Sequence, residues 1–268
     1  MFMKSISPTH FPEVNAILQE LLESIQDILG AHFIGMYLEG SLANGNFDQD
    51  SDIDFVVVTD VEVAEDFFSA LQTMHDRIAT IDSHWATQLE GSYISQEALR
   101  RYDPMNDMHP NIERGSGEHL KMTQHEGVWN VHRHILRERG ITIIGPDPKI
   151  LIDPITPHNL RSAMLSALSS WATHLLNHPE EIRHRGYQSY IVLTLCRILY
   201  TLQVGEVTSK LKSASWTKES IGEKWKTLIE HAWEGRHHSQ MQADKEEIRQ
   251  TLDFINYTLE YSQQVNLT

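Results

Sequence analysis

Two aspartates, one residue apart, stand at the head of an apolar run. Asp52 and Asp54 flank Ile53, and the run Phe55-Val56-Val57-Val58 follows. In a strand, side chains two residues apart point to the same face, so both carboxylates would lie side by side. Like charges that close repel each other unless a cation neutralises them, and carboxylate oxygens select hard ions such as Mg²⁺. The pattern therefore predicts a metal site at the entrance of a buried strand.

A glycine–serine pair precedes these aspartates. Gly40 and Ser41 close a segment that reads as a strand, and ten residues separate Ser41 from Asp52. Backbone N–H groups and a hydroxyl at that position would suit a triphosphate. An isolated Asp-x-Asp is common in turns and would by itself be structural. The combination is more specific, and it favours a metal-dependent phosphoryl-transfer site.

The pattern Gly40-Ser41…Asp52-Ile53-Asp54 resembles the active-site signature of the nucleotidyltransferase superfamily that includes DNA polymerase beta. The resemblance implies a third carboxylate on a neighbouring strand. Glu90, in the segment TQLEGSYI, stands at the expected place, one helix and one strand later. The alternative for a lone glutamate is an exposed position on a strand.

The C-terminal half narrows the resemblance. The segment from Ile191 to Trp216 looks like the helical domain of the aminoglycoside adenylyltransferases, which modify streptomycin and spectinomycin and so confer antibiotic resistance. This similarity implies transfer of AMP from ATP to a hydroxyl of an aminocyclitol, with two Mg²⁺ ions and with the drug in a cleft between domains. It also implies roles for individual residues: Asp52, Asp54 and Glu90 as metal ligands, Glu90 also as the base, and Gly40, Ser41, Arg197 and Lys210 as nucleotide-binding residues.

The positions that would contact the acceptor depart from the family pattern. His119 stands where the streptomycin-modifying members have a tryptophan. Tyr187 and Tyr190, together with Arg183 and Arg185, stand where acidic or small polar residues are expected. Cationic side chains that face a cationic drug weaken its binding. We therefore expect Glu90, His119 and the two tyrosines to contact an acceptor other than streptomycin, and an acceptor that is not an antibiotic stays open.

Hydrophobic spacing indicates the elements that must position these residues. In the first half it predicts helices over 12–30, 63–80 and 128–139 and strands over 32–40, 53–59, 84–95 and 140–148, with a long polar loop over 101–127. A proline-rich boundary over 146–157 precedes helices over 158–176, 187–204, 217–234 and 238–264. We expect an α/β nucleotidyltransferase domain with a mixed sheet (1–150), followed by an α-helical bundle domain (151–268) that completes the cleft for nucleotide and substrate.

The composition limits the partners. Lys and Arg number 22 against 37 Asp and Glu, which gives a net charge of −15. Such a charge disfavours nucleic acid and favours a cationic small molecule, although acidity can also serve solubility alone. No apolar run is long enough to cross a bilayer, the N-terminus lacks the apolar core of a signal peptide, and the single Cys196 excludes an internal disulfide. We expect a cytoplasmic monomer with no membrane partner.

Two other functions stay open at this point. The acceptor hydroxyl could belong to a protein or an RNA, although the negative charge argues against RNA. The chain could also be a catalytically silent module that binds nucleotide for regulation, against which the three intact carboxylates argue. Neither a P-loop signature nor a G-x-S-x-G hydrolase signature is present.

Overall fold

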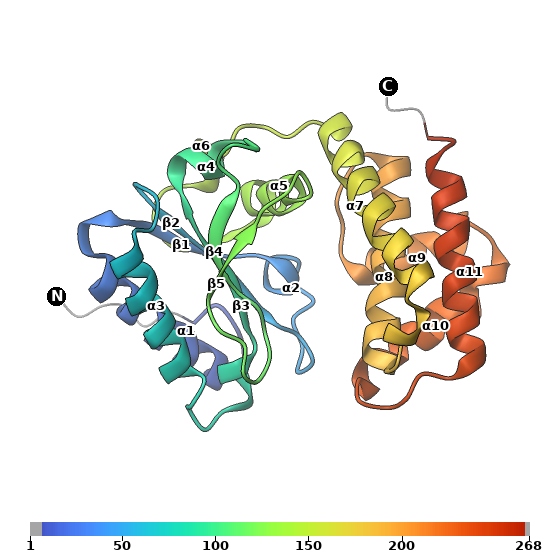
Figure 1. The fold of residues 1–268 in the computed structure, drawn as a ribbon, viewed down its shortest axis with the longest axis horizontal. Helices are drawn as coiled ribbons and strands as arrows, with labels where there is room; N and C mark the ends of the chain where they lie inside the picture. The colour runs from blue at the N-terminus through green and yellow to red at the C-terminus, as the bar shows by residue number, and fades with distance from the viewer. Residues whose placement is uncertain (1–6, 266–268) are drawn as a thin grey trace. The chain divides into compact units, whose positions relative to one another are not determined.

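The computed structural model describes residues 7–265. The chain divides into two compact units, one ending at Pro154 and the other beginning at Ile155 (Figure 1). Each unit is described by itself below.

The N-terminal unit is built around one mixed sheet. Its elements are α1 (Pro12–Leu29), β1 (Phe33–Leu38), α2 (Gly40–Ala43), β2 (Ile53–Thr59), α3 (Glu65–Ile78), β3 (Leu89–Ser95), α4 (Gln96–Arg100), β4 (Met108–Ile112), β5 (Lys121–Gln124), α5 (Trp129–Arg139), β6 (Ile141–Ile144) and α6 (Pro148–Leu151). The strand order is β5-β4-β3-β2-β1-β6, in which β2 and β3 are parallel and the other neighbours antiparallel. The predicted fold class, a mixed α/β sheet followed by helices, is confirmed.

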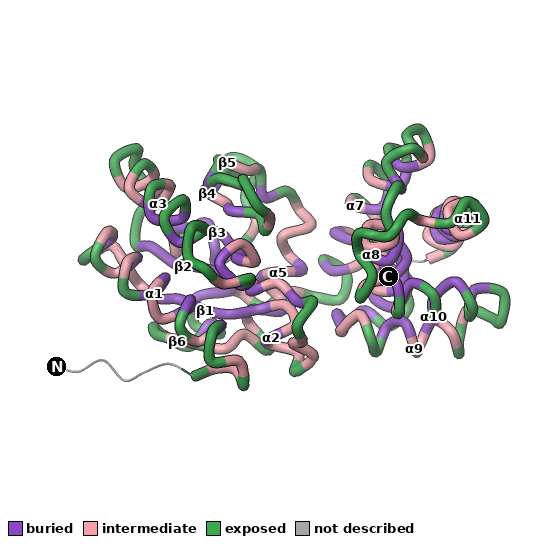
Figure 2. The backbone as a smooth tube through the Cα atoms, turned by 90° about the horizontal axis from the view of Figure 1, so that it is seen from below, coloured by how far each residue is buried: buried purple, intermediate pink, exposed green. Residues whose placement is uncertain are grey.

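Because successive side chains of a strand point to opposite faces, the two faces of the sheet carry different residues. On β2, Ile53, Phe55 and Val57 belong to the hydrophobic core that also contains the apolar faces of α1 and α3. Residues between them, such as Asp54, therefore point to the opposite face. β1 and β2 are largely buried, as the tube in Figure 2 shows. The sheet thus presents its functional side chains on the face that α1 and α3 leave open.

The long polar loop expected over 101–127 is wrong in its central part, because β4 and β5 form a hairpin there. These strands are short and carry inward polar residues, so they lack an apolar alternation. Ser92 on β3 donates to Asn111 Oδ1 on β4 at 2.5 Å. Internal hydrogen bonds, which a hydrophobicity pattern does not show, help to hold this edge of the sheet.

The C-terminal unit is helical, with α7 (Pro157–Asn177), α8 (Arg185–Val204), α9 (Lys210–Ser220), α10 (Lys226–Gly235) and α11 (Lys245–Ser262). α8 contacts each of the other four helices. Gly205 ends it in the left-handed conformation, with φ of 77°. The helix expected over 217–234 is wrong in its bounds: α9 begins at Lys210, which was expected in a loop, and the Ser209 side chain caps its N-terminus.

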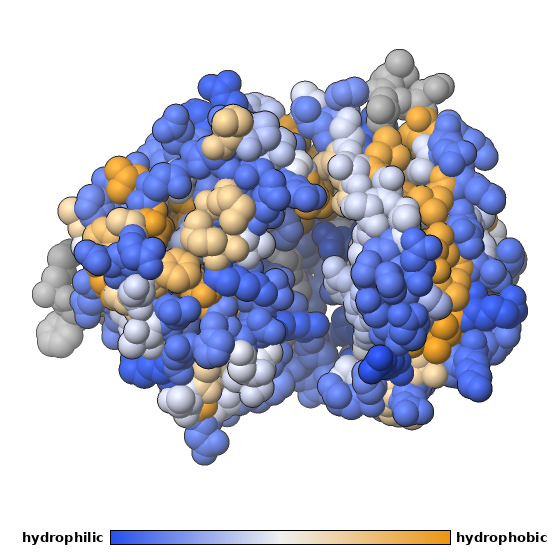
Figure 3. All heavy atoms as spheres, in the orientation of Figure 1, coloured by the Kyte–Doolittle hydropathy of each residue, from blue (hydrophilic) through white to orange (hydrophobic). Residues whose placement is uncertain are grey.

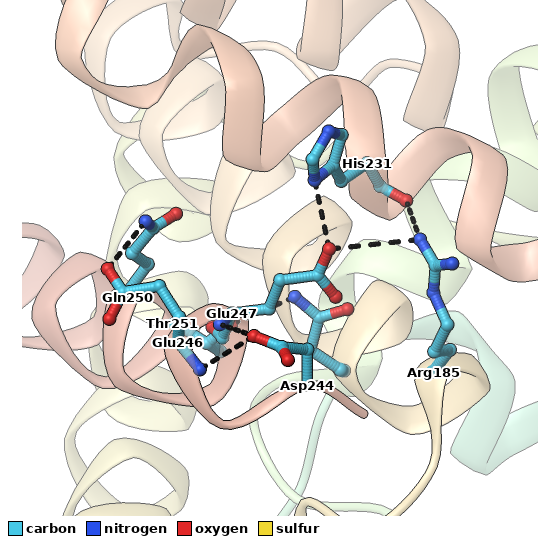
Figure 4. Close-up of polar contacts among 8 residues, drawn as sticks. Arg185, His231, Asp244, Glu246, Glu247, Gln250 and Thr251 are labelled. Carbon is cyan, nitrogen blue, oxygen red and sulfur yellow. Dashed lines mark hydrogen bonds and ion pairs between the residues drawn. The ribbon is translucent and has the colours of Figure 1, made fainter. Parts of the chain in front are cut away.

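A polar cluster joins three helices of this unit (Figure 4). His231 Nδ1 of α10 lies 2.9 Å from Glu247 Oε1 of α11, and Arg185 Nη2 of α8 lies 3.9 Å from the same oxygen. Elsewhere on this unit an apolar strip runs beside α11 on an otherwise mainly hydrophilic surface (Figure 3). Among the described residues, none of the helices has the length and apolarity that crossing a membrane requires.

Candidate metal and nucleotide site

The structure brings Asp52, Asp54 and Glu90 together. Each offers a carboxylate oxygen, and the three oxygens lie within 4.8 Å of one another. The parallel pairing of β2 with β3 sets Asp54 directly beside Glu90, and Asp52 lies one residue before β2. Since all the donors are carboxylate oxygens, the group suits a hard divalent cation such as Mg²⁺.

Gly40 allows the turn after β1 to approach these carboxylates. Its φ is +59°, and a Cβ at this position would lie 1.8 Å from Asp54 Oδ2. The preceding residue, Glu39, donates its backbone N–H to the Asp54 carbonyl at 3.1 Å. Beside the glycine, Ser41 Oγ is buried and has no hydrogen-bond partner within residues 7–265. A buried hydroxyl of this kind is satisfied if it meets a ligand oxygen.

The electrostatics of the site centre on Glu90. Burial raises the pKa of the Glu90 carboxyl, and the charge of Asp52 raises it further, whereas Arg114 and His132 act to lower this pKa. Arg114 Nη1 lies 3.3 Å from Asp52 Oδ2. The guanidinium therefore supplies part of the positive charge that three clustered carboxylates require.

Sequence reasoning missed two of the neighbouring residues, Glu39 and His132. The Glu39 side chain is 7% exposed, and His132 Nδ1 of α5 lies 2.8 Å from its Oε1. No local sequence pattern points to this pair, because the burial of Glu39 is seen only in the structure.

His119, a predicted acceptor contact, lies on another side of this unit. Its Nδ1 is 2.7 Å from Asp76 Oδ1 on α3, and its side chain is 64% exposed. α3 packs on the sheet face opposite to the one that carries Asp54 and Glu90. None of the contacts of His119 therefore brings it to the three carboxylates.

Three of the four predicted residues of the helical unit lie together. Tyr187 and Tyr190 stack with ring centroids 6.2 Å apart, and Lys210 Nζ lies 5.9 Å from the centroid of the Tyr190 ring. Arg197 is partly buried on α8, two turns after Tyr190. A half-exposed aromatic pair beside a lysine is suited to stacking and to anion binding.

A cavity of about 710 Å³ opens at the other end of β2. It is lined by Asp60, which follows β2, and by residues of α4 and the loop after it, and it contains none of the three carboxylates. The cavity is therefore separate from the candidate metal site.

Comparison with known proteins identifies two domains. The family described as "Aminoglycoside adenylyltransferase, C-terminal domain" matches residues 150–260, and the family described as "Nucleotidyltransferase domain" matches residues 18–106. A spectinomycin 9-adenylyltransferase of Staphylococcus aureus is 24% identical over 224 residues, which cover 81% of this chain and 82% of that protein. An aminoglycoside (3'') (9) adenylyltransferase of Escherichia coli is 26% identical over 235 residues, with 81% and 82% covered.

A solved structure shares the fold. The crystal structure of a spectinomycin adenyltransferase from Enterococcus faecialis with ATP and spectinomycin superposes with a TM-score of 0.71. The match covers 91% of this chain and 98% of that chain at 16% sequence identity. At this identity the likeness establishes the fold.

Proposed function

We propose that this chain transfers AMP from ATP to a hydroxyl of an aminoglycoside or aminocyclitol, releasing pyrophosphate. Its matches to the nucleotidyltransferase domain and to the aminoglycoside adenylyltransferase C-terminal domain support this proposal. The observation that carries the proposal is the group of three carboxylate oxygens within 4.8 Å beside the Gly40-Ser41 turn. Relatives named for adenylyl transfer to spectinomycin or aminoglycosides support the class of acceptor.

Asp52, Asp54 and Glu90 would hold two Mg²⁺ ions. When bound, such ions neutralise the phosphate charge and provide Lewis acidity. Glu90 accepts the proton of the acceptor hydroxyl, for which its raised pKa suits it. As that proton leaves, the hydroxyl oxygen bonds to the α-phosphorus of ATP and the bond to pyrophosphate breaks.

The remaining predicted residues have binding roles in this proposal. The Ser41 hydroxyl donates to a phosphate oxygen, beside backbone N–H groups of the Gly40 turn. Arg197 and Lys210 bind the triphosphate as cations. Tyr187 and Tyr190 contact the acceptor, for which the net charge of −15 favours a cationic molecule.

The test is pyrophosphate release from ATP and Mg²⁺ across a panel of aminoglycosides and aminocyclitols, with the product examined for added AMP by mass spectrometry. We expect release that depends on one compound and is lost in Asp54→Asn. Asp153→Asn is the matched control, because Asp153 pairs with Arg100 at 3.2 Å, away from the three carboxylates. Turnover retained in Asp54→Asn would overturn the metal assignment. Silence across the panel, with AMP instead found on a protein or RNA, would overturn the acceptor class.

A further inference from the structure

α5 contacts both ends of the segment from Glu39 to Asn44, which contains Gly40-Ser41 and is called the phosphate turn below. At one end His132 Nδ1 lies 2.8 Å from Glu39 Oε1. At the other end Arg139 Nη1 donates to Asn44 Oδ1 at 2.9 Å. His132 and Arg139 are seven residues apart, which is two helical turns, so both side chains project from the same face of α5.

Burial of the Glu39 carboxylate costs free energy, so its position needs an explanation. Glu39 is 5% exposed, and its Oε2 is buried without a hydrogen-bond partner in the described part of the chain. The His132 side chain is 44% exposed, and pairs that reach solvent contribute little to stability, so the pair is weak evidence for a role in folding. α5 is already anchored by the buried Val131, Ile135 and Leu136. The pair therefore has more to do with geometry than with folding.

The contact at Asn44 continues into the turn. Asn44 donates to the Gly40 carbonyl twice, from Nδ2 at 2.7 Å and from its backbone N–H at 3.2 Å. Arg139 fixes the same side-chain amide through Oδ1, which also determines which way the amide points. Arg139 thus acts on the Gly40 peptide through a single intervening residue.

We propose that His132 and Arg139 are positioning residues for the nucleotide: they hold the phosphate turn from α5, so that the Gly40 backbone and the Ser41 hydroxyl keep the geometry that a triphosphate requires. The inference rests on the proposed function, since it assumes that Mg²⁺-ATP binds at this turn. The His132 ring also gives Glu39 Oε1 a polar partner, which the carboxylate would otherwise lack beside the phosphates. A preorganised turn binds its ligand more tightly because no ordering has to occur on binding.

The experiment measures the Kd of Mg²⁺-ATP by titration calorimetry and, where an acceptor has been found, the KM values for ATP and acceptor and kcat. The variants are His132→Leu and Arg139→Met. His132→Asn is the conservative variant, because the asparagine amide replaces the Nδ1 donor. The controls are His32→Leu and Arg100→Met, the same substitutions at side chains that contact Asp60 (2.9 Å) and Asp153 (3.2 Å) in the same unit, away from the phosphate turn.

We expect the Kd and KM for ATP to rise about tenfold in His132→Leu and in Arg139→Met, a loss of about 1.4 kcal/mol. The KM of the acceptor stays within about twofold, His132→Asn recovers most of the ATP affinity, and the controls bind like the wild type. A purely structural role would lower the melting temperature without this split between the two KM values. If His132→Leu does not fold, Arg139→Met alone decides: wild-type affinity in that variant overturns the inference.

The inference is overturned if Arg139→Met and His132→Leu both bind Mg²⁺-ATP like the wild type. It is also overturned if the controls lose as much ATP affinity as these two variants. If the wild type itself binds no Mg²⁺-ATP, the proposed function fails and the inference fails with it. Normal wild-type binding with unaffected variants overturns the inference alone.

Discussion

Mg²⁺ should stabilise the N-terminal unit, and the gain should depend on pH. Without a cation, the oxygens of Asp52, Asp54 and Glu90 lie within 4.8 Å of one another. At an effective dielectric constant of about 20, each pair of full charges at that distance repels by about 3.5 kcal/mol. A divalent ion removes this repulsion in the folded state and finds no such group in the unfolded chain.

The size of the gain follows from linkage. At a concentration of about 100 times its Kd, an ion that binds only the folded state adds about 2.7 kcal/mol. For a unit of this size such an increment raises the melting temperature by about 5–10 °C. The shift belongs to the transition of the N-terminal unit, because the three carboxylates all lie before Pro154.

The pH dependence follows from Glu90, whose pKa is raised by burial first and by Asp52 second. The folded state therefore keeps a proton that the unfolded chain has already released. Without metal, stability falls as the pH rises from the ordinary value of 4.5 through the raised pKa. Mg²⁺ displaces that proton, so its stabilising effect grows across the same window.

The assay is thermal denaturation with and without Mg²⁺ from pH 5 to pH 8, on the wild type, Asp52→Asn, Asp54→Asn and the control Asp153→Asn. The two site variants should lose most of the Mg²⁺-dependent gain, and the control should keep it. An equal gain in Asp54→Asn, or a gain that does not grow with pH, would refute the reasoning.

Four further predictions concern single side chains. Gly40→Ala should destabilise the N-terminal unit by about 2 kcal/mol and abolish the Mg²⁺ effect in the same thermal assay, because its Cβ would lie 1.8 Å from Asp54 Oδ2. Arg133→Met should cost about 2–4 kcal/mol in urea unfolding, since the buried guanidinium donates to the Leu99 and Ala98 carbonyls at 3.1 and 2.8 Å. Burial lowers the pKa of His125 to about 2, so the contribution of the neutral ring to stability should be fully present above the ordinary value of 6.5 and be lost as the pH drops below it. The unfolding free energy of His125→Gln should fall less steeply with decreasing pH than that of the wild type, and equal slopes would contradict this. Glu247→Ala should cost about 1–2 kcal/mol in thermal unfolding of the helical unit by releasing His231 and Arg185, whereas an unchanged melting temperature would show that the cluster in Figure 4 is not stabilising.

Much of the fold could be predicted because periodicity is a local signal. The apolar spacing of 12–30 and the aspartate-headed run over 53–59 match α1 and β2 within one residue at each end. The β4–β5 hairpin was not predicted because polar contacts such as Ser92 to Asn111 help to hold it against β3, and 19 residues separate these partners in the sequence. The bounds of α9 and α10 were predicted wrongly because the residues on both sides of Gly222, whose φ is 113°, have a helical composition that hides the break there.

The site was predictable where residues share an element and unpredictable where they do not. The spacing of Asp52 and Asp54 fixes a common face, and the superfamily resemblance supplied Glu90. Arg114 beside Asp52 and His132 beside Glu39 come from distant segments, and the latter pair spans 93 residues. No local pattern specifies such partners, since a surface charge and a paired charge look alike in a sequence.

The geometry of the sheet nevertheless shows where such a partner was needed. In an antiparallel pair, residues opposite each other point to the same face. The pairing of Leu38 with Phe55 and the bond from Glu39 N to the Asp54 carbonyl set Glu39 opposite Asp54, which in turn lies beside Glu90. Glu39, directly after β1, thus stands in a row with Asp54 on β2 and Glu90 on β3, yet the motif predicts a metal-binding role for only the last two. Glu39 has its polar partner outside the motif, on α5, where His132 Nδ1 lies 2.8 Å from Glu39 Oε1. A motif that gathers carboxylates therefore needs polar partners from a neighbouring helix, and in this chain His132 of α5 supplies one to Glu39.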